Sequence, residues 1–83
     1  YVSWKERIRR RDKYTCQICG SKIQPQIHHI LGYSKHPSLR GTDWNSIVLC
    51  KECRVKYHQL YTGEDINPYT FVQFMKQQRR ARI

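Results

Sequence analysis

The chain of 83 residues carries 16 Lys and Arg side chains against 6 Asp and Glu, a formal net charge of +10, and only 39% of it is hydrophobic. A chain this short forms one domain at most and buries a small core, so a metal or disulfides are expected to help it fold. No apolar run approaches the roughly 20 residues of a membrane span and no signal-like start is seen, so we expect neither a membrane span nor a secretory signal. The excess positive charge favours a polyanionic partner, because Lys and Arg neutralise phosphates and release counterions.

Residues 2–11 are predicted to form the first helix, with Ser3 and Glu6 at capping-box spacing. Trp4 and Ile8 lie four positions apart and are expected to pack inward from one face. The other positions are largely basic, and such a run forms either an ordinary solvated surface or a phosphate-binding face. The basic residues of this helix are Lys5, Arg7, Arg9, Arg10 and Arg11.

The four cysteines form two CxxC pairs, Cys16 with Cys19 and Cys50 with Cys53, about thirty residues apart. Each pair places two thiolates on one tight knuckle, and two knuckles complete a tetrahedron around a structural Zn²⁺. A redox function for one CxxC pair would leave the second pair unexplained. Reduced cysteines of this kind also indicate an intracellular protein.

A strand is predicted from Gln24-Pro25 through residue 31, and it contains two adjacent histidines. Strand alternation sends Ile27 and His29 to one face and His28 and Ile30 to the other. The two histidines can therefore act from the same side only where the strand is bulged or twisted.

Residues 32–46 are rich in turn formers and predict a loop of about fifteen residues, a length that is usually functional in a small domain. Residues 47–49 are a predicted second strand, able to pair antiparallel with the first. Residues 51–61 follow as a predicted second helix, with Val55 as an inward contact.

A third helix is predicted to start at Asn67, the N-cap, with Pro68 in its first turn. Phe71, Phe74 and Met75 form its apolar stripe, which is expected to be core rather than a recognition surface. The helix leads into a basic tail that contains Arg79, Arg80 and Arg82.

The pair His28-His29, followed by Asn45 and then by the second CxxC pair, resembles the HNH nuclease motif in its four-cysteine zinc form. Residues 11–20 match how that family opens its first knuckle. Residues 28–61 are similar to phage-type HNH homing endonucleases, and the resemblance covers about residues 4–62.

This resemblance implies a small, zinc-stapled α+β domain with a ββα-metal fold: a hairpin and a helix around a catalytic ion, flanked by N- and C-terminal helices. Residues 1–83 are then a single domain with a motif core over 12–62. Residues 1–11 form the basic N-terminal helix, and residues 67–83 the C-terminal helix and tail.

The resemblance also assigns roles to residues. His29 is the expected general base that deprotonates a water for attack on a phosphodiester. His28 is the expected ligand of a catalytic Mg²⁺ or Mn²⁺, which stabilises the leaving oxygen. Asn45 is expected to hold the His29 imidazole or its loop. The plain alternative is two ordinary strand histidines and a turn asparagine.

Arg54 departs from the family's pattern, which places a metal-binding histidine directly after the last cysteine. A guanidinium has no free lone pair, and its charge opposes a nearby divalent ion. Arg54 disables the metal site, or His58 supplies the ligand instead, or Arg54 grips the phosphate and replaces part of the ion's charge. We favour the first or third interpretation, because one helical turn displaces His58 by about 5.4 Å along the axis.

Double-stranded DNA is the partner that the resemblance implies. It also implies an intracellular location, in the cytoplasm or nucleoid, and includes a phage among the expected sources. The expected phosphate contacts are the basic residues of the first helix, Lys35 and Arg40 in the loop, Lys56 on the second helix, and the tail. Two other functions stay open. One is a DNA-binding module of the same fold with a disabled site. The other is a zinc-ribbon or RING-like interaction domain, which would leave the two histidines and the charge unexplained.

Overall fold

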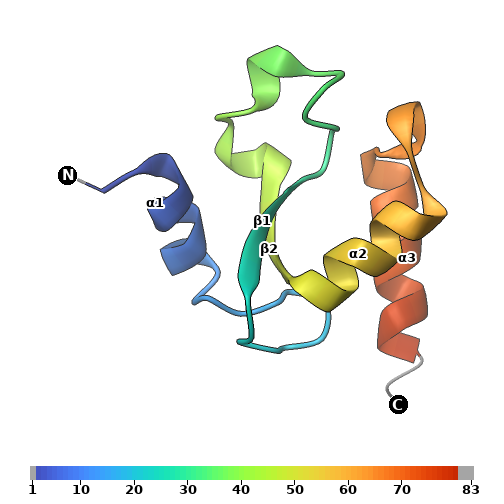
Figure 1. The fold of residues 1–83 in the computed structure, drawn as a ribbon, viewed down its shortest axis with the longest axis horizontal. Helices are drawn as coiled ribbons and strands as arrows, with labels where there is room; N and C mark the ends of the chain where they lie inside the picture. Colours follow the sequence, from blue (N-terminus) through green and yellow to red (C-terminus); the bar gives the residue numbers. More distant parts are fainter. Residues whose placement is uncertain (1, 81–83) are drawn as a thin grey trace.

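A two-stranded antiparallel hairpin lies at the centre of the fold (Figure 1). The computed structural model describes residues 2–80, except for the side chain of residue 80. Strand β1 (Pro25–His29) pairs with β2 (Ser46–Cys50), so that Pro25 lies opposite Cys50 and His29 opposite Ser46. The antiparallel pairing predicted for these segments is therefore confirmed.

Three helices surround the hairpin: α1 (Trp4–Arg11), α2 (Lys51–Leu60) and α3 (Pro68–Arg80). Figure 1 shows α1 on one side of the hairpin and α2 and α3 on the other. The small α+β class is confirmed, with a hairpin followed directly by α2 and a further helix on each flank. Within residues 2–80, no helix is both long and apolar enough to cross a membrane.

The main core lies between the hairpin, α2 and α3. Leu49, Tyr57 and Phe74 are fully buried there, and Phe71 is almost so. Three of the four cysteines are buried in the same cluster, so the predicted zinc site is continuous with the core. A metal at this place would tie the first knuckle to the hairpin and to α2 at once.

The pairing register separates the strand residues onto two faces. His28 lies opposite Ile47, and this face packs against α2 and α3. His29 belongs to the other face with Val48, on the side of α1. The prediction that the two histidines point to opposite faces is confirmed, because neither strand contains a bulge that would break the alternation.

Helix α1 begins two residues later than predicted because Ser3 is its N-cap. The Ser3 hydroxyl accepts a hydrogen bond from the Glu6 backbone N–H at 3.2 Å. Ile8 is fully buried as predicted, whereas Trp4 is only partly buried. Helix α3 starts as predicted, with the Asn67 side chain accepting from the Thr70 N–H at 3.0 Å.

The prediction that Val55 packs inward is wrong, since its side chain is 43% exposed. The inward face of α2 is instead set by Cys53 and Tyr57, one helical turn apart. Because Cys53 points into the core with the other cysteines, Val55 is rotated to the outside of the helix. Helix α2 ends at Leu60, one residue earlier than predicted, and Leu60 is also exposed.

Strand β1 ends at His29, two residues earlier than predicted. Beyond it, the Leu31 N–H donates to the Asn45 side chain at 2.7 Å instead of to a β2 carbonyl. The predicted loop that follows contains two short 3₁₀ turns, Pro37–Leu39 and Asp43–Asn45. The loop is thus folded back against the end of the hairpin, where His28 and His29 lie.

Candidate active site and zinc centre

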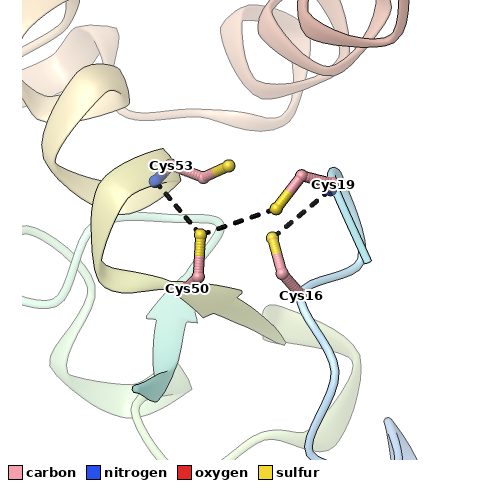
Figure 2. Close-up of side chains that lie close together, drawn as sticks. All are labelled: Cys16, Cys19, Cys50 and Cys53. Atoms are coloured by element: carbon pink, nitrogen blue, oxygen red, sulfur yellow. Dashed lines mark hydrogen bonds between the residues drawn. The ribbon is translucent and has the colours of Figure 1, made fainter. Parts of the chain in front are cut away.

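The four cysteine sulfurs form one cluster, with all Sγ atoms within 4.8 Å of one another (Figure 2). The Sγ atoms of Cys19 and Cys50 are 3.6 Å apart. Four thiolates at Zn–S distances of about 2.3 Å stand roughly 3.8 Å apart in a tetrahedron, so the donor set fits one zinc ion. No disulfide links these residues. Within the described part of the chain, this is the one cluster of three or more such ligands.

Each knuckle directs a backbone N–H at a sulfur. The Cys19 N–H donates to Cys16 Sγ at 3.5 Å, and the Cys53 N–H donates to Cys50 Sγ at 3.4 Å. Burial acts to raise the pKa of the Cys16 thiol, but backbone N–H groups outweigh it and lower this pKa to about 7. Gly20 closes the first knuckle at φ +79, a conformation that other residues rarely adopt.

His29 has a fixed orientation at the end of β1. Its Nε2 lies 2.8 Å from the Arg40 carbonyl oxygen. A carbonyl only accepts, so in the neutral ring Nε2 carries the proton and Nδ1 holds the free lone pair. Trp4 stacks on the ring at 5.9 Å between centroids, and Tyr33 meets it edge-on at 5.3 Å. The His29 ring is thus held in one orientation.

Asn45 is fully buried and holds the loop, not the imidazole. Its Oδ1 accepts from the Leu31 N–H at 2.7 Å, and its Nδ2 donates to the carbonyls of Leu31 and Leu39 at 3.1 and 3.3 Å. Because Arg40 follows Leu39, this contact holds the peptide unit directly before the Arg40 carbonyl that His29 contacts. Asn45 is therefore a positioning residue.

His28 is 2% exposed and packs between the rings of Tyr57 and Phe71, at 5.0 and 5.1 Å between centroids. Its Nε2 is buried without a hydrogen-bond partner among residues 2–80. Burial, with smaller contributions from nearby positive groups, lowers the pKa of His28 to about 3. The ring is accordingly neutral, which is the form that binds a metal.

His58 lies beside His28, with ring centroids 5.4 Å apart, although it is one turn further along α2 than Arg54. Burial and the charge of Arg54 lower the pKa of His58. A small cavity of about 60 Å³ is lined by His28, His29, Arg54 and His58. The two strand histidines reach one cavity from opposite faces because the strand ends at this point.

Arg54 forms a wall of this cavity. Its Nη1 donates to Gln26 Oε1 at 3.3 Å, and its Nε is buried without a partner among residues 2–80. An unpaired buried donor is costly, and a phosphate oxygen would satisfy it. Gln26 was not singled out in the sequence, because one glutamine in a strand carries no signal of its own.

A second and larger cavity of about 590 Å³ lies against His29. Three aromatic rings border it, those of Trp4, His29 and Tyr33. Four of the predicted phosphate contacts or site cations line it as well: Lys5, Arg9, Arg40 and Arg54. Tyr33 was missed in the sequence, where it is only an aromatic residue in a loop.

Several other predicted phosphate contacts take part in exposed ion pairs: Arg7 with Asp43 at 3.0 Å, Arg10 with Glu6 at 3.7 Å and Lys56 with Glu52 at 3.2 Å. Exposed pairs of this kind contribute little to stability, so these cations can still exchange partners for a phosphate. Lys35 is exposed in the loop.

Arg11 has a structural function. Its guanidinium pairs with Asp12 at 2.8 Å and donates to the carbonyls of Asp43 and Ser46 at 2.9 and 2.7 Å. Asp12 in turn accepts from the Val48 N–H at 2.9 Å. The hydrogen bond and charge of Asp12 raise the pKa of Arg11. These contacts tie α1 to β2 and leave Arg11 poorly placed to bind phosphate.

Arg79 donates to the Gln17 carbonyl at 3.1 Å and so joins α3 to the first knuckle. The side chain of Arg80 and all of Arg82, both predicted phosphate contacts, lie outside the described residues. Of the three predicted phosphate contacts in the tail, the structure describes the side chain of Arg79 alone.

Comparisons with protein-family models, with curated proteins and with solved structures found no match for this chain. The function is therefore inferred from the geometry of the site.

Proposed function

We propose that this chain is an HNH-type endonuclease domain of the ββα-metal kind, which hydrolyses phosphodiester bonds of DNA with His29 as general base. The hydrogen bond from His29 Nε2 to the Arg40 carbonyl carries the proposal, because it leaves Nδ1 as the free lone pair. A net charge of +10 and the cations around His29 support a phosphate substrate.

In the proposed reaction, His29 Nδ1 takes a proton from a water molecule. The water oxygen forms a bond to phosphorus while the bond from phosphorus to the leaving oxygen breaks, and that oxygen takes a proton from solvent. General bases of this kind typically accelerate such a step by about 10²–10⁴-fold. Asn45 contributes indirectly, because it fixes the loop that orients His29.

The side chains at the small cavity determine whether a divalent ion could bind there. His28 offers a buried nitrogen that has no partner in the described part of the chain, and the ring of His58 lies beside it, so two neutral imidazoles fit as ligands. A divalent ion bound there would supply positive charge to the leaving oxygen. Imidazoles alone favour transition ions over Mg²⁺, which prefers oxygen ligands. Mn²⁺ shares that preference for oxygen ligands, so Mg²⁺ and Mn²⁺ are both predicted to bind weakly at this cavity.

Arg54 stands directly after the last cysteine, where the HNH pattern has a metal-binding histidine. Its charge opposes an ion in the same cavity. Its Nε–H has no partner among residues 2–80, and we assign it to a phosphate oxygen. The site would then bind a divalent ion weakly and the phosphate directly. A second function is favoured by the same residue: a DNA-binding module of this fold whose cleavage site is disabled.

A supercoiled-plasmid nicking assay separates the two functions. The chain is compared with His29→Ala, each with added Mg²⁺, Mn²⁺ or EDTA, while DNA affinity is measured in parallel. The endonuclease proposal expects nicking that His29→Ala abolishes, with DNA affinity nearly unchanged. If the parent chain does not nick DNA but binds it with the same affinity as the His29→Ala variant, the disabled DNA-binding module is supported instead.

A further inference from the structure

The larger cavity beside His29 combines aromatic and cationic side chains. Its volume of about 590 Å³ lies in the range of about 300–1,000 Å³ that is typical of small-molecule sites. Among the described residues that line it, none is acidic. Such a composition suits a ligand that offers both a flat ring and negative charge, as a nucleotide does.

The aromatic rings of this cavity are held in place. Trp4 Nε1 donates to Asp43 Oδ1 at 2.9 Å, and the Trp4 ring stacks on His29. The Arg40 guanidinium lies 3.9 Å from the centre of the Tyr33 ring, and its Nε donates to the Tyr33 carbonyl at 2.8 Å. These contacts restrict the rings before any ligand arrives, which lowers the entropy lost on binding.

Tyr33 is nevertheless 57% exposed. A tyrosine at this exposure contributes little to the core. Because Tyr33 lines a basic cavity, its exposed ring surface is available to a ligand there. Paired bases are already stacked on both faces inside a duplex, so they have no free face to offer such a ring. An unpaired base can stack on it, and base–aromatic stacking is worth about 1–3 kcal/mol per base.

We propose that this cavity binds an unpaired nucleotide of a DNA strand, with its base on the Trp4 and Tyr33 rings and its phosphates on the surrounding cations. The inference rests on the proposed function, because it names the substrate class of the same site. The domain then prefers DNA with an unpaired segment, such as a single strand, a flap or a frayed end, over a fully paired duplex.

The test measures fluorescence anisotropy of a labelled oligo-dT strand and of a duplex of equal length, at one fixed salt concentration. The variants are Tyr33→Ala, Tyr33→Phe and, as a matched control, Tyr69→Ala on α3, where Tyr69 is 73% exposed. We expect Tyr33→Ala to weaken strand binding about tenfold. Tyr33→Phe and Tyr69→Ala should stay within about twofold of the parent, and duplex affinity should be unchanged in all three.

Equal losses on strand and duplex, or no loss with Tyr33→Ala, would overturn the inference. Cleavage is scored separately on the same two substrates. A chain that never cuts but keeps the Tyr33-dependent preference for the strand refutes the proposed endonuclease and supports this cavity's assignment. A chain that cuts while Tyr33→Ala affects both substrates alike refutes the assignment and leaves the endonuclease in place.

Discussion

The rings of His28 and His58 lie 5.4 Å apart, although one belongs to β1 and the other to α2. Helix α2 starts directly after β2, which pairs with β1, so the hairpin carries α2 back over His28. The contact places His28 Nε2, which is buried and has no hydrogen-bond partner within residues 2–80, next to a second imidazole. Arg54 lies on the wall of the same cavity, and under the proposed function its charge opposes a cation bound there.

Arg54→His should tighten binding of a divalent ion and raise metal-dependent nicking by at least about tenfold. At an effective dielectric of about 20, repulsion between neighbouring charges exceeds the ~1.4 kcal/mol that corresponds to a factor of ten. Mn²⁺ titration calorimetry measures the first effect and plasmid nicking the second. Gln59→His adds an imidazole to the exposed side of α2 and should change neither. Unchanged ion affinity in Arg54→His would contradict the assigned cavity.

The buried His28 should make the domain less stable as pH falls. Its pKa is lowered from an ordinary 6.5 to about 3, so the unfolded chain binds one more proton between these values. The contribution of the neutral ring to the free energy of unfolding is fully present above pH 6.5. It decreases toward pH 3, by up to about 1.4 kcal/mol per pH unit. Urea unfolding at several pH values, within the range in which zinc stays bound to both proteins, should show a steeper fall for the parent than for His28→Phe. Parallel curves would show that His28 titrates normally in the folded protein.

Asn45→Ala should lower the free energy of unfolding by about 1–3 kcal/mol, because it leaves the Leu31 N–H without its partner. Urea denaturation with saturating zinc measures this change. Ser38→Ala, an exposed position in the same loop, is the control and should stay within about 0.5 kcal/mol of the parent. A loss no larger than that of Ser38→Ala would mean that the buried amide does not hold the loop.

Removal of zinc should unfold the domain, because the four-cysteine cluster is part of the main core. Circular dichroism should lose its helical signal after treatment with a strong chelator under reducing conditions, and added Zn²⁺ should restore it. Cys50→Ser should give the same unfolded spectrum even with zinc present. Full secondary structure in the chelated sample would show that the core is sufficient without metal.

Local spacing and strand alternation, read from the sequence alone, determined much of this protein. The two CxxC pairs predict a sulfur cluster, Ser3 and Asn67 predict helix starts, and alternation places His28 and His29 on opposite faces. Each of these depends on residues close together along the chain, whose geometry is set by a turn, a helix or a strand.

Only the tertiary structure decided which side chains are used together. Val55 points outward because Cys53 and Tyr57 face the core, and Arg11 joins α1 to β2. The tertiary structure also placed Trp4 and Tyr33, residues far apart in the chain, around His29. These outcomes depend on how the loop and α1 pack against the hairpin end. Packing of that kind joins residues distant in sequence, so no local pattern encodes it.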